Sequence, residues 1–415
     1  MSTAQLALMG GPKTRIEMPG TWPVSGKEER DALLAVLESD AWGRLSGSVT
    51  ATVEHKLAVM LGVRYVICLN SGQTALRLAV LALNPPAGSE IICPAYTFIA
   101  TAMAIIEANC VPVFADIEPG TLCLDAKSVA SHITPKTVAI MPVHLAGIPT
   151  DMDALCALAD KHHIAIIEDA SHAHLSTWHN RPVGSIGNVG CFSLQASKNL
   201  NCGEGGFITT NDPDLYRRIS AIQNNGRIPD DPQRYRHATL GGNYRMTEFQ
   251  AAILGAQLTR LPAQTSLRHA NGKRLNRCLS GIDGFHPKVD RVAETCNAYH
   301  LYCFEIDLVY FDVNRFLVLD ALRAEGIACG PGYATLVYEH DAFRNKDFGP
   351  YSAASEGYNA SVCQNDAQCP VSVHIGHHVG AWLPMTELNT DTAGIEVIVD
   401  AFRKVSAGSE QLRKA

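Results

Sequence analysis

The chain has 415 residues, of which 47% are apolar and 18% are charged, and its formal net charge is -7. This composition indicates an ordinary globular protein that is long enough for two domains. The negative charge and the lack of basic runs argue against nucleic acid or an anionic membrane as the main partner. The apolar run from Leu6 to Met9 is too short for a signal-peptide core or a membrane span. The thirteen cysteines form no Cys-x-x-Cys pair, so we expect reduced thiols, a cytoplasmic protein and no metal site.

The order of predicted elements indicates an α/β fold. Residues 1–26, rich in Gly and Pro, should form an arm on the body, followed by helices at 28–38 and 53–60. From residue 65 onward, short apolar runs alternate with helical patterns, which predicts a mostly parallel sheet flanked by helices. The strands are predicted at 65–69, 90–93, 111–114, 138–142 and 164–168, and the helices between them at 74–83, 101–108 and 152–162.

The stretch FSLQASKNLNCGEGG, residues 192–206, places Lys198 between two further strands predicted at 189–194 and 206–210. A lysine is costly to bury unless its amine has a partner or a reaction. A desolvated amine titrates low enough to form an imine with an aldehyde or a ketone. For this stretch taken alone, a lysine on a solvated turn is the simpler alternative.

Three other strand ends carry candidate ligand-binding residues, because ligands bind beyond the carboxyl ends of parallel strands. NSGQTA, at 70–75, offers backbone N–H groups to a phosphate, although a helix cap explains it equally well. PAYTF, at 94–98, offers an aromatic ring that could lie on a planar ligand or only pack. EDASH, at 168–172, places a carboxylate at a buried strand end, where a protonated pyridine nitrogen or a structural salt bridge could pair with it.

These features share one chemical theme. A phosphate cradle, with Ser193 as a second ligand, a stacking aromatic, a buried carboxylate and an imine-forming lysine are what pyridoxal phosphate requires. Each feature is ambiguous alone, but their joint occurrence at successive strand ends predicts a pyridoxal-phosphate enzyme.

The chain resembles the DegT/DnrJ/StrS family of pyridoxal-phosphate aminotransferases, which act on sugars and aminocyclitols and have fold type I. The resemblance covers nearly the whole chain and includes Gly10-Gly11-Pro12, Trp42-Gly43-Arg44, NSGQTAL, PAYTFIATA, MPVHLAG, IEDASHA, FSLQASKNLNCGEGG and GGNYRMTEFQAAILGAQL. It implies a large cofactor-binding domain at 1–267, arm included, with a mostly parallel central sheet. A smaller C-terminal α+β domain would occupy 268–415.

The resemblance also implies roles for individual residues. The catalytic residues would be Lys198, which binds the cofactor and moves the proton, Asp169 at the pyridine nitrogen and His172 near the ring hydroxyl. Asn243 matches an asparagine that reaches the phosphate across a dimer interface, so we expect a homodimer with a shared active site. The full set of expected cofactor-binding residues is Gly72, Gln73, Phe98, Asp169, His172, Ser193, Lys198 and Asn243.

The C-terminal part has a less regular pattern. A helix at 247–279, bent or broken at Pro262, should bridge to the smaller domain. That domain should contain a strand at 300–307 and helices at 313–325 and 392–407. Residues 351–370, rich in Ser, Ala, Asn and Gln, are predicted to be a surface connection.

The expected reaction moves an amino group from L-glutamine or L-glutamate to a ketone on a cyclitol or sugar, with pyridoxamine phosphate as the intermediate form of the cofactor. The arm and the Trp-Gly-Arg region resemble members that act on scyllo-inosose-like cyclitols or make aminohydroxybenzoate in antibiotic biosynthesis. Candidate substrate contacts are Arg44, Tyr333 and His378, for which packing or surface positions are the simpler interpretation.

The alternatives are another acceptor for the same reaction, another reaction of the same cofactor, and proteins that are not aminotransferases. A nucleotide-linked keto-sugar is the alternative acceptor, which Arg227, Arg234 and Arg236 in one loop could bind. A pyridoxamine-phosphate-dependent sugar dehydratase is disfavoured, because relatives with that activity replace the lysine by histidine. A cofactor-sensing regulator would need a basic helix-turn-helix, and a Rossmann protein would need GxGxxG after the first strand, and neither is present.

Overall fold

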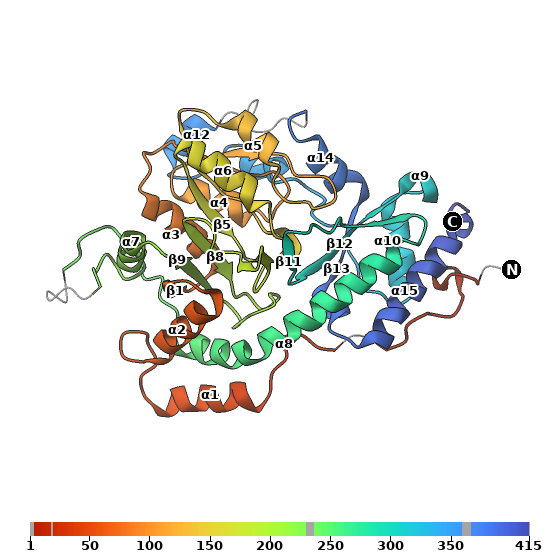
Figure 1. The fold of residues 1–415 in the computed structure, drawn as a ribbon, viewed down its shortest axis with the longest axis horizontal. Helices are drawn as coiled ribbons and strands as arrows, with labels where there is room; N and C mark the ends of the chain where they lie inside the picture. Colours follow the sequence, from red (N-terminus) through yellow and green to blue (C-terminus); the bar gives the residue numbers. More distant parts are fainter. Residues whose placement is uncertain (1–3, 18–19, 230–235, 359–366, 415) are drawn as a thin grey trace.

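A computed structural model describes residues 4–17, 20–229, 236–358 and 367–414. A seven-stranded sheet in the order β1-β9-β8-β5-β4-β2-β3 forms the centre of the larger lobe (Figure 1). Its strands are β1 (Tyr65–Leu69), β2 (Glu90–Pro94), β3 (Val111–Ala115), β4 (Thr137–Ile140), β5 (Ala165–Asp169), β8 (Val189–Ser193) and β9 (Gly206–Thr210). All seven were predicted from the sequence, with only small shifts at their ends.

The sheet is mostly parallel, as predicted. The pairs β2–β3, β2–β4, β4–β5 and β5–β8 are parallel, whereas β9 is antiparallel to both β1 and β8. Strand β9 alone is reversed because a hairpin joins it to β8, whereas parallel neighbours need a longer crossover connection. That hairpin carries Lys198.

Helices cover both faces of the sheet. Along β1, Ile67 and Leu69 pack into one hydrophobic cluster while Val66 and Cys68 pack into another, as expected for a strand buried on both sides. The helices on the first face are α3 (Gly72–Leu83), α4 (Ala100–Glu107) and α7 (Pro213–Gln223), and those on the second are α2 (Val49–Leu61), α5 (Ala126–His132), α6 (Met152–His162) and the start of α8. Helix α5 was not predicted, because Val129 is its one buried residue and leaves no apolar periodicity.

Helix α8 (Glu248–Leu279) runs from the larger lobe to the smaller one (Figure 1). Thr247 begins it with a capping box, in which its hydroxyl accepts from the Gln250 N–H and the Gln250 side chain bonds back to Thr247. Pro262 lies inside the helix, so the expected bend or break does not end it there. Helix α1 (Lys27–Glu38) lies alongside, tied by an ion pair between Glu29 and Arg260.

The smaller lobe has an antiparallel sheet of β10 (Phe285–Pro287), β12 (Leu301–Ile306) and β13 (Gly380–Pro384). The predicted strand and the two predicted helices of this region are present. The helices are α9 (Leu308–Phe311), α10 (Arg315–Ala324), α15 (Thr392–Ala407) and α16 (Ser409–Leu412). A separate small sheet contains β6 (Thr177–Trp178), β7 (Arg181–Pro182) and β11 (Glu294–Cys296).

The N-terminal arm lies on the body, as predicted for its described residues. Leu6, next to the 3-10 turn η1 (Ala7–Met9), is fully buried in the core of the smaller lobe. Farther along, Arg15 pairs with Glu387 at 2.5 Å, and the indole N–H of Trp22 donates to the carbonyl oxygen of Ala196 at 3.1 Å. The arm therefore links the smaller lobe to the Lys198 hairpin.

The prediction of a surface connection at 351–370 is wrong for its first part. Helix α12 (Ser352–Gly357) places Ala354 and the following Tyr358, both fully buried, in a core cluster of the larger lobe. The polar composition of the stretch concealed these two anchors, and residues 359–366 lie outside the described residues. The other short elements here are η3 (Val337–Glu339), α11 (Asp341–Arg344), α14 (Pro370–Val373), the π-helical turn η4 (His374–Val379) and η5 (Met385–Leu388).

The proposed boundary between domains, after residue 267, falls inside α8 and stays a prediction. Each helix among the described residues is too short or too polar to cross a membrane.

Candidate active site

Lys198 lies in the hairpin between β8 and β9. Backbone hydrogen bonds of 2.8 Å, from the N–H of Leu194 to Gly205 O and from the N–H of Ala196 to Gly203 O, close this hairpin. Burial lowers the pKa of the Lys198 amine to about 8, although the nearby Asp169 carboxylate acts in the opposite direction. The neutral, nucleophilic form of the amine is therefore more accessible near neutral pH than in a solvent-exposed lysine.

Asp169 ends β5 and is almost completely buried. Its carboxylate accepts hydrogen bonds from the hydroxyl of Thr101, in the first turn of α4, at 2.8 Å and from the backbone N–H of Ser171 at 3.2 Å. These bonds fix the orientation of the carboxylate. A buried carboxylate held in this way can bind a protonated nitrogen.

His172 follows β5 and is also buried. Its Nδ1 accepts a hydrogen bond from the backbone N–H of Ala146 at 3.3 Å, so the neutral ring carries its proton on Nε2. Burial, together with the charge of Lys198, lowers the pKa of His172 well below its usual value. His172 is thus an uncharged hydrogen-bond donor through Nε2.

The start of α3 lies against the end of β8. A Cβ atom on Gly72 would lie 2.7 Å from the Cβ of Ser193, so the close approach requires glycine. Ser71 caps the helix by accepting from the N–H of Thr74 at 3.1 Å. The remaining N–H groups of this helix end, with the Ser193 hydroxyl, form a cradle suited to a phosphate. The side chain of Gln73 donates to Glu107 at 3.0 Å, so Gln73 would offer an anion its backbone N–H.

These groups surround one cavity of about 580 Å³. Phe98 lies in the loop after β2 and is 57% exposed, which leaves much of its ring accessible to a ligand. Asn243 is exposed and does not line the cavity of its own chain. The structure thus brings together seven of the eight predicted cofactor-binding residues, namely Gly72, Gln73, Phe98, Asp169, His172, Ser193 and Lys198.

Comparison with known families decides the class of protein. The DegT/DnrJ/EryC1/StrS aminotransferase family matches residues 23–388. The chain belongs to this family. It is therefore an aminotransferase that depends on pyridoxal phosphate, and the fold and cofactor predicted from the sequence are confirmed.

Individual relatives match most of the length of this aminotransferase. The L-glutamine:2-deoxy-scyllo-inosose aminotransferase of Streptoalloteichus tenebrarius is 37% identical over 347 residues, which cover 80% of this chain and 81% of the relative. The enzyme of the same name from Micromonospora echinospora is 32% identical over 428 residues, which cover 98% and 99%. The crystal structure of 3-amino-5-hydroxybenzoic acid synthase has a TM-score of 0.83 and 30% identity, and covers 94% of this chain and 99% of that one.

The residues present in this family member fit the cofactor. Gly72 lets the N-terminal end of α3 approach the Ser193 hydroxyl closely, because a Cβ at that position would collide with the serine, and an anion can bind between such groups. The buried carboxylate of Asp169 can pair with a protonated ring nitrogen, and the Lys198 amine has no hydrogen-bond partner among the described residues. A phosphate, a basic nitrogen and an aldehyde therefore each find a suitable group in one cavity.

Some cavity residues had not been assigned from the sequence. Thr101, Glu204, His300 and Trp382 all line the cavity, together with Tyr333, which had been named as a candidate substrate contact. His300 begins the strand predicted at 300–307, and the local pattern offered no reason to assign it a role. Trp382 carries no local signal, because it reaches the cavity from β13 through the folding of the smaller lobe.

The other candidate contacts lie elsewhere. The Arg44 guanidinium donates to both carboxylate oxygens of Glu54, at 2.6 and 2.9 Å, and does not line the cavity. His378 is exposed outside the cavity, and Arg227 and Arg236 do not line it either. Arg234 lies outside the described residues.

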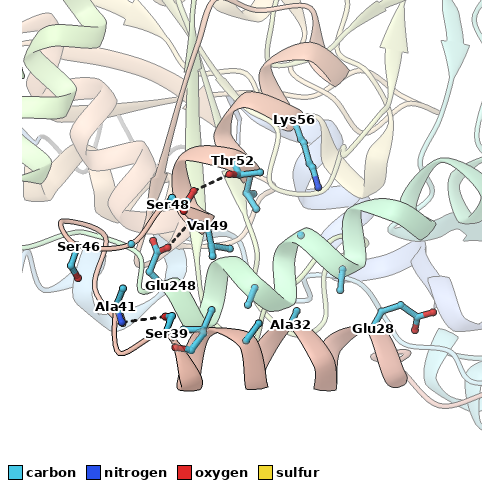
Figure 2. Close-up of a pocket in the computed structure, with 17 residues that line it drawn as sticks. Glu28, Ala32, Ser39, Ala41, Ser46, Ser48, Val49, Thr52, Lys56 and Glu248 are labelled. Atoms are coloured by element: carbon cyan, nitrogen blue, oxygen red, sulfur yellow. Dashed lines mark hydrogen bonds between the residues drawn. The ribbon is translucent and has the colours of Figure 1, made fainter.

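A second cavity, of about 440 Å³, lies between α1, α2 and the start of α8 (Figure 2). Small side chains such as Ala32 and Ala252 form much of its wall. At one end Glu248 accepts hydrogen bonds from the backbone N–H groups of Val49 at 2.6 Å and Thr50 at 3.2 Å, and so caps α2 from a different helix. None of the predicted site residues lines this cavity.

Proposed function

We propose that this aminotransferase transfers the amino group of L-glutamine to the keto group of a scyllo-inosose-like cyclitol, in the biosynthesis of an antibiotic or a related secondary metabolite. Two relatives that match it over most of their length are named for L-glutamine and 2-deoxy-scyllo-inosose, which supports this donor and this class of acceptor.

The charge of the cavity is the observation that carries the proposal. Lys198 is the one lysine or arginine among the described residues that line it. A nucleotide diphosphate would need further cationic partners for its phosphates. A neutral polyol needs hydrogen-bonding and aromatic groups, and the cavity offers Ser171, Gln195, Ser197 and Tyr333. This lining therefore favours a free cyclitol over a nucleotide-linked sugar.

Bound pyridoxal phosphate supplies an electrophilic carbonyl and accepts electrons from the α-carbon of the amino donor. In our proposal, Lys198 holds that carbonyl and, once released, moves the proton from the α-carbon of the donor, a role that its lowered pKa supports. Asp169 would pair with the protonated ring nitrogen, and His172 would donate through Nε2 to the ring oxygen. Ser193 and the start of α3 would hold the phosphate, and Phe98, which also lines the cavity, would contact the ring.

We infer, in addition, that the site is completed in a homodimer. Asn243 is exposed and lies outside the cavity of its own chain, which supports a contact with the phosphate of a second copy.

Absorption spectroscopy of the cofactor-loaded protein tests the proposed reaction. L-glutamine should convert the cofactor from its pyridoxal to its pyridoxamine form, scyllo-inosose should convert it back, and Lys198→Ala should do neither. A nucleotide-linked keto-sugar should convert the pyridoxamine form back to the pyridoxal form much more slowly. If L-glutamine leaves the spectrum unchanged, L-glutamine is not the amino donor. If only the nucleotide-linked sugar restores the pyridoxal form, the acceptor is not a free cyclitol.

A further inference from the structure

His300 lines the active-site cavity from the smaller lobe. It lies just before β12 and shares this wall with Leu301, Tyr333 and Trp382. It is 7% exposed, and its ring centroid lies 4.4 Å from that of His172.

Hydrogen bonds fix the tautomer of His300. The side-chain N–H of Asn199 donates to the carbonyl oxygen of Ala298 at 2.8 Å, so its Oδ1 is the acceptor in the 3.2 Å bond with Nδ1 of His300. The proton of the neutral His300 ring is therefore on Nδ1, and Nε2 carries a free lone pair. His172 has the opposite arrangement, so the two adjacent rings offer one donor and one acceptor.

His300 also stays uncharged. Burial lowers its pKa well below the usual value, and the neighbouring cationic or protonatable groups His172, Lys198, His174 and Arg268 lower it further. Nε2 therefore remains an acceptor at working pH. No hydrogen bond to this atom is formed within the described part of the chain, so a ligand in the cavity can donate one to it.

We propose that Nε2 of His300 accepts a hydrogen bond from a ring hydroxyl of the acceptor, and that His300 thereby selects a polyhydroxylated ring. The adjoining wall fits such a ring, because Tyr333 and Trp382 pack perpendicular to each other, with centroids 5.0 Å apart, and form an apolar corner beside the histidine. This inference rests on the proposed function, since it assumes a cyclitol acceptor.

Separate measurement of the two half-reactions tests the assignment. His300→Phe keeps a flat ring but removes the acceptor, so KM for scyllo-inosose should rise about tenfold while the L-glutamine half-reaction stays within about twofold of wild type. His300→Gln, which retains an acceptor oxygen, should recover part of the loss. His162→Phe changes an exposed histidine outside the cavity and should alter neither half-reaction. If phenylalanine prevents folding, His300→Ala serves the same comparison.

Deoxy analogues locate the contact. Among the monodeoxy derivatives of scyllo-inosose, one should bind wild type and His300→Phe equally well, because it lacks the hydroxyl that His300 holds. An unchanged KM, the lack of any such analogue, or an equal slowing of the L-glutamine half-reaction would overturn the assignment. A wild-type protein that fails to react with L-glutamine or with any inosose would instead refute the proposed function, so the two failures are distinguishable.

Discussion

Lys198 imposes a cost on the folded protein before any cofactor binds. Because its pKa falls from 10.5 to about 8, it is charged in both folded and unfolded states below that pH, and burial of the charge then destabilises the fold. Between about pH 8 and pH 10.5 the unfolded state binds more protons, so stability rises with pH in this window. The residue is thus tuned for chemistry at the expense of stability.

We predict that Lys198→Met raises the free energy of unfolding of the cofactor-free protein at pH 7 by about 1–3 kcal/mol, and that the gain shrinks towards pH 10. Urea denaturation at both pH values measures it. Lys56→Met, at an exposed lysine, should change the free energy by less than about 0.5 kcal/mol. A Lys198→Met protein that is less stable than wild type at pH 7 would contradict this account.

Gly72 gives a second prediction at this scale. Its substitution by alanine places a methyl group 2.7 Å from the Cβ of Ser193, which forces the start of α3 away from β8. Such overpacking costs about 1–3 kcal/mol, so pyridoxal phosphate should bind about 10- to 100-fold more weakly. Cofactor titration followed by absorbance measures the change. The matched control is Gly281→Ala, whose added Cβ has only an ordinary contact at 3.6 Å. If the two variants bind pyridoxal phosphate with equal affinity, the start of α3 does not bind the phosphate as proposed.

At the scale of elements, the site residues that could be predicted from the sequence are those that lie at or just after the ends of strands. Phe98, Asp169 and Lys198 each come soon after an apolar run, and the carboxyl ends of parallel strands meet at one edge of the sheet. Local pattern was therefore enough to place them in one cavity. The reversal of β9 was not foreseen, because strand direction depends on the length of a connection rather than on composition.

The rest of the site depends on tertiary structure. His300, Tyr333 and Trp382 enter the cavity from segments that have no regular alternation of strands and helices. Their positions follow from the packing of the smaller lobe against the larger one, which no local window encodes. Thr101 was likewise unassigned, because a threonine in the first turn of a helix has many uses besides binding a carboxylate.

The N-terminal end of α2 gives a prediction for one element. Glu248 is fully buried, and its carboxylate accepts a hydrogen bond from the N–H of Val49 (Figure 2). It also accepts hydrogen bonds from the N–H and the hydroxyl of Thr50. In Glu248→Gln the uncharged amide accepts these bonds less well, so the free energy of unfolding should fall by about 1–3 kcal/mol. Thermal denaturation measures this loss. Glu396→Gln, which removes a partly exposed ion pair with Arg274, should cost less than about 1 kcal/mol, and equal losses would argue against the cap.

At the scale of the whole molecule, the two lobes are tied together by more than α8. The arm buries Leu6 in the smaller lobe and bonds through Trp22 to the hairpin that carries Lys198. His300 and Asn199 form a second link, between β12 and the residue that follows the lysine. A change in the position of the smaller lobe would therefore reach the lysine hairpin along both routes.

The proposed homodimer gives a prediction that needs two copies of the chain. If Asn243 serves the site of its partner, Lys198→Ala and Asn243→Ala damage a site from different subunits. After the two variants are mixed and reassociated, half of the dimers should be mixed, and one of the two sites in each should contain both residues intact. Activity at limiting cofactor should then reach about a quarter of the wild-type value, although each variant alone is far weaker. If Asn243 instead served its own chain, each intact Lys198 would stay paired with a damaged Asn243. The mixture would then show only the average of the two separate activities, and the shared site would be refuted.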